Sequence, residues 1–574
     1  MTQIKPVLGG IILLLITACS LNPKIGSGDA EGDEESAASY TEEQWSEEVM
    51  FQLRAAAHAG GGAEHAEAIS QLIGQARGQE DLELLRQAAG MAWRTQSWAS
   101  LIDATETWRQ WEPAADDPRR LQILALFNAD RPGEAIDAMR QWLSDSPDEI
   151  DRLLRREFVQ ILAATEQTDQ AVEHLDAVIA RSSPDLAEVS VLAARSRLHW
   201  ELGQPDQALE LAILALDHSN AREDFSWAAQ LASALGDYEL ALSLYRRARE
   251  RAPDEWMLGL AEAQTLRELE RIDEALVVLS ALPDNPDVLY NRASYLYEAG
   301  QVESATAAWQ DLADLAPVEN QNQHAFMVAW LAEFLELDRQ AADWYGRVRG
   351  GAQVDRAMIR RAVLLAEDDQ LAEARELLKL ARDTEQADQR ERAYLVEAEL
   401  LTDSGRALEA REILTGALRE TPNSIGLLYA RAITAVESDD LELAEQDLRR
   451  IIRLDGENAM ALNALGYTLT DRTSRHNEAY RLIRRALELS PDEPAILDSM
   501  GWVYFRSGRP EAALPYLKRA HASGDNPEIV AHLVEVLWQL DEVAEAKEIL
   551  REASSRYPDS EHLINVTERL EIVL

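Results

Sequence analysis

Apolar residues recur at helical spacing from about residue 44 to the end of the chain. Short segments rich in Ala, Leu, Glu and Arg follow one another, and alternating β-branched runs are almost absent. This pattern predicts an all-α protein. Because a chain of 574 residues built from short helices is typical of repeat architectures, internal repetition is the next feature to test.

One alanine recurs in the second helix of each predicted helical hairpin, with a mean period of about 34 residues. Proline stands twelve residues after this alanine in six of thirteen hairpins, and glycine stands five residues before it in five. The glycine predicts a left-handed residue that ends the first helix, and the proline stops the second helix. The small alanine side chain lets the two helices approach closely. The thirteen anchor alanines are Ala135, Ala171, Ala208, Ala241, Ala275, Ala305, Ala341, Ala374, Ala410, Ala444, Ala479, Ala513 and Ala546.

Residues 466–494 (GYTLTDRTSRHNEAYRLIRRALELSPDEP) and 501–520 (GWVYFRSGRPEAALPYLKRA) show the pattern most fully. They resemble the tetratricopeptide repeat, with Gly466 or Gly501 as the small residue of the first helix and Pro491 as the closing proline. The resemblance implies a right-handed superhelical solenoid of about 13–14 helix-turn-helix repeats, whose concave surface is lined by first helices.

Two hairpins depart from the period. The spacing from Ala275 to Ala305 is four residues short of 34, and one extra residue separates Gly466 from Ala479. We expect local changes of geometry at these places and no change of fold.

The start of the chain predicts a lipid anchor. Lys5 and the apolar run from 7 to 16 form a secretory signal sequence that is too short to span a bilayer. The residues Ile-Thr-Ala-Cys at 16–19 resemble the bacterial lipobox, which implies cleavage after residue 18 and lipidation of Cys19, the only cysteine. Ser20 follows the cysteine, and in such lipoproteins a residue other than Asp there implies sorting to the outer membrane, with the chain facing the periplasm.

The remaining chain divides into four predicted parts. Residues 19–43 form the lipidated cysteine and an acidic tether rich in Gly and Ser, which we expect to be disordered. Residues 44–115 form an N-terminal helical region with degenerate repeats, residues 116–558 the tetratricopeptide superhelix, and residues 559–574 a C-terminal capping helix.

Composition excludes several functions. With 56 Lys and Arg against 103 Asp and Glu, the net charge of −47 argues against nucleic acid as a partner. The acidic charge favours a basic partner, or it reflects adaptation to a salty habitat. The ten histidines lack metal-ligand spacing, and neither a G-x-S-x-G elbow nor a phosphate-binding loop is present. The sequence therefore predicts no catalytic residue, no metal and no cofactor, so the protein is expected not to be an enzyme.

Candidate partner-binding residues follow from the repeat register. In tetratricopeptide domains the concave positions are the third residue before the small first-helix residue and the first, fourth and fifth residues after it. Exposed aromatic side chains there suit extended peptides or a partner's helix, although individual rings can instead pack between neighbouring repeats. The candidates are Asn463, Tyr467, Asp471, Asp498, Trp502, Arg506, Glu535, Trp538, Tyr290, Tyr297, Phe326 and Trp330.

Residues 461–520 also resemble a family of long outer-membrane tetratricopeptide lipoproteins of gammaproteobacteria. The resemblance implies a scaffold or adaptor that binds and activates a periplasmic carboxyl-terminal processing protease and presents substrates such as peptidoglycan hydrolases. An alternative is a lipoprotein that assembles or pilots a pilus, secretin or outer-membrane barrel complex. A third alternative, a sugar-active enzyme on a helical toroid, requires acids that converge in one cavity.

Overall fold

The computed structural model describes residues 62–165, 168–182, 186–315, 321–384, 386–524 and 526–572. Within these ranges every regular element is a helix and no strand occurs, which confirms the all-α prediction. No helix in the described ranges is long and apolar enough to cross a membrane. The predicted signal sequence, Cys19 and the tether lie outside the described residues, so these remain predictions.

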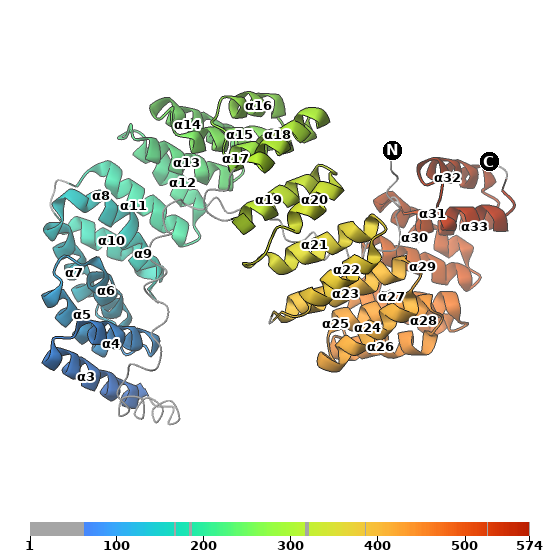
Figure 1. Cartoon of the computed structure of the whole chain (residues 1–574), viewed down its shortest axis with the longest axis horizontal. Helices are drawn as coiled ribbons and strands as arrows, with labels where there is room; N and C mark the ends of the chain where they lie inside the picture. The colour runs from blue at the N-terminus through green and yellow to red at the C-terminus, as the bar shows by residue number, and fades with distance from the viewer. Residues whose placement is uncertain are drawn as a thin grey trace. The chain divides into compact units, whose positions relative to one another are not determined.

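The helices form two compact units, whose described residues lie within 62–315 and within 321–572. In each unit a first helix pairs with the second helix that follows it, and each hairpin contacts the next (Figure 1). The helices of the earlier unit are α3 (Gly62–Gln79), α4 (Leu82–Arg94), α5 (Trp98–Trp111), α6 (Asp116–Asn128), α7 (Pro132–Asp145), α8 (Ile150–Arg152), α9 (Phe158–Ala163), α10 (Ala171–Ala180), α11 (Glu188–Glu201), α12 (Pro205–Ala215), α13 (Arg222–Ala234), α14 (Tyr238–Arg251), α15 (Trp256–Glu268), α16 (Ile272–Ser280), α17 (Pro286–Glu298) and α18 (Val302–Asp314).

The later unit continues the same alternation to the end of the described chain. Its helices are α19 (Gln321–Phe334), α20 (Asp338–Tyr345), α21 (Val354–Glu367), α22 (Leu371–Ala381), α23 (Ala387–Asp403), α24 (Ala407–Glu420), α25 (Ile425–Glu437), α26 (Leu441–Leu454), α27 (Ala459–Arg472), α28 (His476–Leu489), α29 (Pro494–Arg506), α30 (Pro510–Ser523), α31 (Pro527–Gln539), α32 (Val543–Arg556) and α33 (Glu561–Arg569). The last of these lies in the segment predicted as a capping helix.

Each anchor alanine marks the point where its second helix meets the first helix. All thirteen are completely buried, with 0% of their surface exposed. A Cβ atom on Gly501 would lie 2.5 Å from Leu517 Cγ and 3.3 Å from the Ala513 carbonyl oxygen, so the backbones leave no room for a side chain there. In the hairpin of α11 and α12, Ser196 Oγ donates a hydrogen bond to the Ala208 carbonyl oxygen at 2.7 Å. The repeat register predicted from these alanines is confirmed.

The first helices end as the glycine pattern predicts. The five glycines that stand five residues before an anchor have φ between 70° and 79°, the left-handed conformation. Six other hairpins place an acidic residue at the same position with φ between 58° and 62°, namely Asp130, Glu270, Glu336, Asp369, Asp439 and Asp541. The turn therefore requires the left-handed backbone whether or not glycine supplies it.

Both irregular hairpins have a local explanation. Helix α16 is only 9 residues long, whereas α14 has 14, so the short spacing before Ala305 corresponds to about one lost helical turn. After α27 the residue Thr473 adopts φ −141° and ψ 175°, so an extended residue replaces the left-handed one and the turn takes one residue more.

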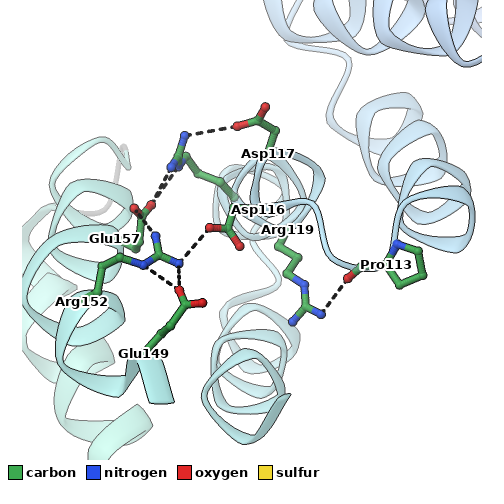
Figure 2. Close-up of polar contacts among 8 residues, drawn as sticks. Pro113, Asp116, Asp117, Arg119, Glu149, Arg152 and Glu157 are labelled. Carbon is green, nitrogen blue, oxygen red and sulfur yellow. Dashed lines mark hydrogen bonds and ion pairs between the residues drawn. The ribbon is translucent and has the colours of Figure 1, made fainter. Parts of the chain in front are cut away.

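The first helix of one hairpin in the earlier unit contains a π-turn. Helices α8 and α9 are joined by the π-helix Leu153–Glu157, and Glu157 at its end is only 4% exposed. Arg152 Nη1 donates to Glu157 Oε1 at 3.0 Å, and its Nη2 donates to Asp116 Oδ2 at 2.8 Å (Figure 2). Arg120 Nη2 donates to Glu157 Oε2 at 2.7 Å. This network compensates the buried carboxylate and fixes the π-turn against α6.

Replacing Glu270 by glycine tests the left-handed position. We expect Glu270→Gly to stabilise the fold by about 1 kcal/mol, because an L-residue at φ 59° is strained and glycine is not. The check is the midpoint of denaturant unfolding followed by circular dichroism. Gly236→Ala is the reverse control, at φ 79° with no atom within 4 Å of the added Cβ, and should destabilise by a similar amount. Equal midpoints for all three proteins would contradict the assignment.

Candidate functional site

We define the first-helix face as the residues at the third position before, and the first, fourth and fifth positions after, the small residue of each first helix. Neighbouring first helices contact one another in the later unit, including α21 with α23, α23 with α25, α27 with α29 and α29 with α31. The face is therefore continuous over α21, α23 and α25 and again over α27, α29 and α31, and the second of these stretches contains the candidate residues of the C-terminal repeats.

Five polar and aromatic residues join three successive first helices, and we call them the α27–α31 cluster: Tyr467, Asp498, Trp502, Glu528 and His532. The Tyr467 hydroxyl donates to Glu528 Oε1 at 2.5 Å across two repeats. His532 Nδ1 lies 3.0 Å from each carboxylate oxygen of Asp498, and the Trp502 ring stacks on His532 with centroids 3.9 Å apart. The cluster thus locks α27, α29 and α31 together.

The electrostatics of the cluster favour a protonated His532. Burial lowers the pKa of His532, but Asp498, Glu528 and Glu535 together outweigh it and leave this pKa above its ordinary value. Burial and the Glu528 carboxylate raise the pKa of Tyr467 well above its usual range, so Tyr467 remains a donor. In the ranges that the structure describes, no three His, Cys, Asp or Glu side chains are grouped so that they could hold a metal ion.

Several candidate residues are packing residues. Trp502 and Asp498 are 4% and 5% exposed, and Phe326 is 6% exposed and lies edge-on to Tyr345 with centroids 5.6 Å apart. The rings of Trp502 and Phe326 therefore pack against other side chains of the protein, which is the alternative stated above for individual rings. The Asn463 Oδ1 atom is buried and accepts no hydrogen bond from the described residues.

The other candidates lie nearer the surface. Arg506 Nη1 is 3.3 Å from Asp471 Oδ1, which joins the ends of α29 and α27, and Arg569 pairs with Glu535. Tyr290, Tyr297 and Trp538 are partly buried.

Helix α19 carries the most accessible of the candidate rings. Trp330 is 38% exposed, and Phe334, four residues later on the same face, is 44% exposed. Trp330 was predicted as the first residue after Ala329, and the same register places Phe334 at the fifth position.

A line of carboxylates on the first-helix face was not among the predicted residues. Glu367, Asp403 and Glu437 occupy the fifth position after the small residues of α21, α23 and α25, and Glu399 occupies the first position in α23. Burial raises the pKa of all four, and repulsion by Asp403 adds to the shift at Glu399 and Glu437. No hydrogen bond or ion pair joins them to a cation in the described chain. Asp471 was predicted at the fifth position after Gly466, and Glu367, Asp403 and Glu437 occupy the same position in their own repeats.

Comparison with known families agrees with this geometry. Models of the tetratricopeptide repeat match residues 504–570, residues 228–282 and 429–494, and residues 189–212. The chain is a tetratricopeptide-repeat protein. Its repeats belong to a fold that typically serves as a protein-interaction scaffold.

Curated relatives match only part of the chain. A TPR repeat-containing protein of Pseudomonas aeruginosa is 40% identical over 210 residues, which is 37% of this chain and 35% of that protein. The type IV pilus assembly protein PilF of Pseudomonas aeruginosa is 24% identical over 147 residues, 25% of this chain and 58% of PilF. The matched regions thus span about a third and somewhat over half of these relatives' own lengths.

Solved structures with helical repeats are similar as well. Yeast Tom70 is 15% identical, with 67% of this chain and 95% of that chain covered and a TM-score of 0.30. A tetratricopeptide repeat protein from Parabacteroides merdae is 14% identical, with 44% and 99% covered and a TM-score of 0.37. The repeat assignment rests on the family models and the buried alanines rather than on these likenesses.

Breaking the ion pair of the α27–α31 cluster should unfold the last repeats. We expect His532→Phe to cost on the order of 3–5 kcal/mol, because it keeps an aromatic ring against Trp502 but leaves the Asp498 carboxylate buried without a cation. Denaturant unfolding measures the loss. The double variant His532→Phe with Asp498→Leu should recover most of it, since no charge is then buried. Equal losses in both variants would show that the pair contributes nothing as an ion pair.

The same pair predicts a pH dependence. Because the pKa of folded His532 lies above its ordinary value, the stabilisation by its charge is complete below about pH 6.5 and is lost as the pH rises through the folded pKa. The difference in stability between the wild type and His532→Phe should therefore shrink between pH 6 and pH 8.

Removing one acid of the carboxylate line should have the opposite effect. We expect Glu437→Gln to raise the unfolding midpoint slightly at pH 7, because burial and Asp403 oppose the charge of this carboxylate. Since the pKa is raised in the folded state, the gain should vanish below about pH 4, where both states are protonated. Glu420→Gln is the matched control, because Glu420 also ends a helix but is exposed and unpaired in the described chain. An equal gain in the control would assign the effect to the helix end.

Proposed function

We propose that this protein is a non-enzymatic outer-membrane lipoprotein scaffold that binds and activates a periplasmic carboxyl-terminal processing protease and presents substrates such as peptidoglycan hydrolases to it. The scaffold part of this proposal follows from the repeats. The protease and its substrates come from the resemblance of residues 461–520 to the lipoprotein family. The lipid at Cys19 would hold both partners at the membrane and raise their effective concentration.

The observation that carries the proposal is the accessible aromatic pair on the first-helix face of α19. Trp330 and Phe334 expose 38% and 44% of their surface, at positions where tetratricopeptide domains contact partners. Large aromatic side chains contribute most of the binding energy at many protein interfaces. The carboxylates Glu367, Asp403 and Glu437 occupy the first-helix face of α21, α23 and α25 and favour a partner segment that carries basic residues.

The similarity to PilF supports a second candidate function. PilF is named as a pilus assembly protein, and more than half of it aligns with this chain. A lipoprotein that assembles or pilots a pilus, secretin or outer-membrane barrel complex would use the same anchor and the same face. The two candidates differ in the partner, so the partner decides between them.

A degradation assay tests the first candidate. The full chain carrying Cys19→Ser is mixed with the processing protease and a peptidoglycan hydrolase from the same organism, and loss of the hydrolase is followed by gel electrophoresis. We expect rapid degradation only when this protein is present. Trp330→Ala should weaken protease or substrate binding about tenfold or more without unfolding the chain, because the ring is accessible. Trp502 is unsuitable as a probe because it is buried.

Leu380→Ala is the control for Trp330→Ala. Leu380 is 61% exposed on the second helix α22, away from the first-helix face, and its removal should leave degradation unchanged. If the wild type does not accelerate degradation, the protease proposal is wrong. Capture of pilus, secretin or barrel-assembly subunits by the lipidated protein in native membranes would then support the second candidate.

A further inference from the structure

Arg197 is a half-buried cation with no ion pair in the described chain. It occupies the first position after Ser196, the small residue of α11, and thus lies on the first-helix face. Its Nη1 atom is buried and has no hydrogen-bond partner, and the structure gives Arg197 no ion pair in the described ranges. A guanidinium offers five donors, and leaving the buried Nη1 donors without a partner costs free energy.

The acids near Arg197 are already engaged. Arg155, in the π-turn before α9, pairs with Asp151 and reaches across to Asp224 at the start of α13. The other oxygen of Asp224 accepts from Ser219 at 2.5 Å, and Asp151 accepts from Ser190 Oγ at 2.6 Å. Burial lowers the pKa of Arg197, and repulsion by Arg155 adds to the shift. The protein thus holds two guanidinium groups together and pairs only one of them.

A tryptophan fixes the position of the unpaired guanidinium. Arg197 Cζ lies 4.8 Å from the centre of the Trp227 ring, and Trp227 Nε1 donates to Ser196 Oγ at 2.8 Å. The cation–π contact stabilises the guanidinium against the ring and orients it. It does not satisfy the N–H donors, which lie in the plane of the guanidinium rather than towards the ring.

Accessible groups surround this position. Trp200, one helical turn after Arg197, is 37% exposed and packs edge-on to Trp227 with centroids 6.3 Å apart. Arg156, on the first-helix face of the preceding hairpin, is exposed and has no ion pair in the part of the chain that the structure describes. A ligand at Arg197 would therefore meet unfilled donors, a second cation and an exposed ring surface.

We propose that Arg197 binds a carboxylate of an extended partner segment, and that Trp200 packs against the apolar side chain next to that carboxylate. Carboxylates match the planar donors of a guanidinium and form two parallel hydrogen bonds with it. A monoanion fits better than a phosphate dianion, because Asp151 and Asp224 already place two negative charges beside the site. This site lies in the earlier unit and does not depend on whether the partner is a protease.

Small carboxylates test the site directly. The full chain carrying Cys19→Ser is titrated with N-acetyl-leucine, N-acetylleucinamide and the α-amide of N-acetylglutamate, and ligand-observed NMR gives the dissociation constants. We expect N-acetyl-leucine to bind at least tenfold more tightly than its amide. Arg197→Met should abolish this preference, and Arg197→Lys should retain part of it, because an ammonium keeps the charge but loses the two-pronged geometry. If the glutamate derivative binds as well as N-acetyl-leucine, acidic side chains are ligands; if it does not, the ligand is a chain terminus.

Arg267→Met is the matched control. Arg267 is on the first-helix face of α15 and donates to Glu298 Oε1 at 2.9 Å, so its removal should leave the preference for the acid intact. Arg197→Met should melt no lower than the wild type, because it removes a half-buried charge that has no ion pair and keeps an apolar stem against Trp227. Equal binding of acid and amide by the wild type would overturn the proposal, as would equal losses in both methionine variants. Tighter binding of inorganic phosphate than of N-acetyl-leucine would overturn the choice of a carboxylate.

Discussion

The close approach of two helix backbones in each hairpin is the constraint on which the rest of this structure depends. Every anchor alanine is fully buried, and the residue opposite it is glycine, serine or another small residue in the hairpins described above. A Cβ atom on Gly466 would overlap Ile483 and lie 3.2 Å from the Ala479 carbonyl oxygen. Because protein interiors are close-packed, this contact leaves little freedom in the rotation of the first helix. The contact between the two backbones therefore decides which residues of the first helix face the neighbouring hairpins.

The same rotation gives the first-helix face two different uses. In the α27–α31 cluster, Trp502 and His532 stack between neighbouring helices and the face is closed by its own side chains. On α19, Trp330 stands at the position of Trp502 and is accessible, and Phe334 four residues later is accessible as well. Trp502 is buried where α31 supplies the His532 ring as its stacking partner. A face that is partly closed and partly open suits a scaffold that is rigid and still offers contacts.

Charge follows a similar division. The chain has a large excess of acid, yet many acids are bound by arginines of neighbouring hairpins, as Glu157 is by Arg120. One set of acids and one arginine depart from this rule. The carboxylates on α21, α23 and α25 form no ion pair with a cation within the described chain, and Arg197 forms none with an anion there. Such uncompensated charges destabilise a folded protein, and both lie on the first-helix face where a partner would supply the missing charge.

The sequence by itself determined the helical class, the repeat register and the turn positions, because these depend on local spacing. An alanine about every 34 residues, and a glycine five positions before it in five hairpins, are visible in a single chain. The register places the positions of the first-helix face, although the carboxylates of α21, α23 and α25 were not among the predicted binding residues. Only the tertiary structure decided which of them are accessible and which are paired, because the partners come from distant repeats. Tyr467 meets Glu528 61 residues later, and Arg155 meets Asp224 69 residues later, so that Arg197 is left without an ion pair in the described chain. Contacts of this range arise from the packing of whole hairpins, and no local pattern records them.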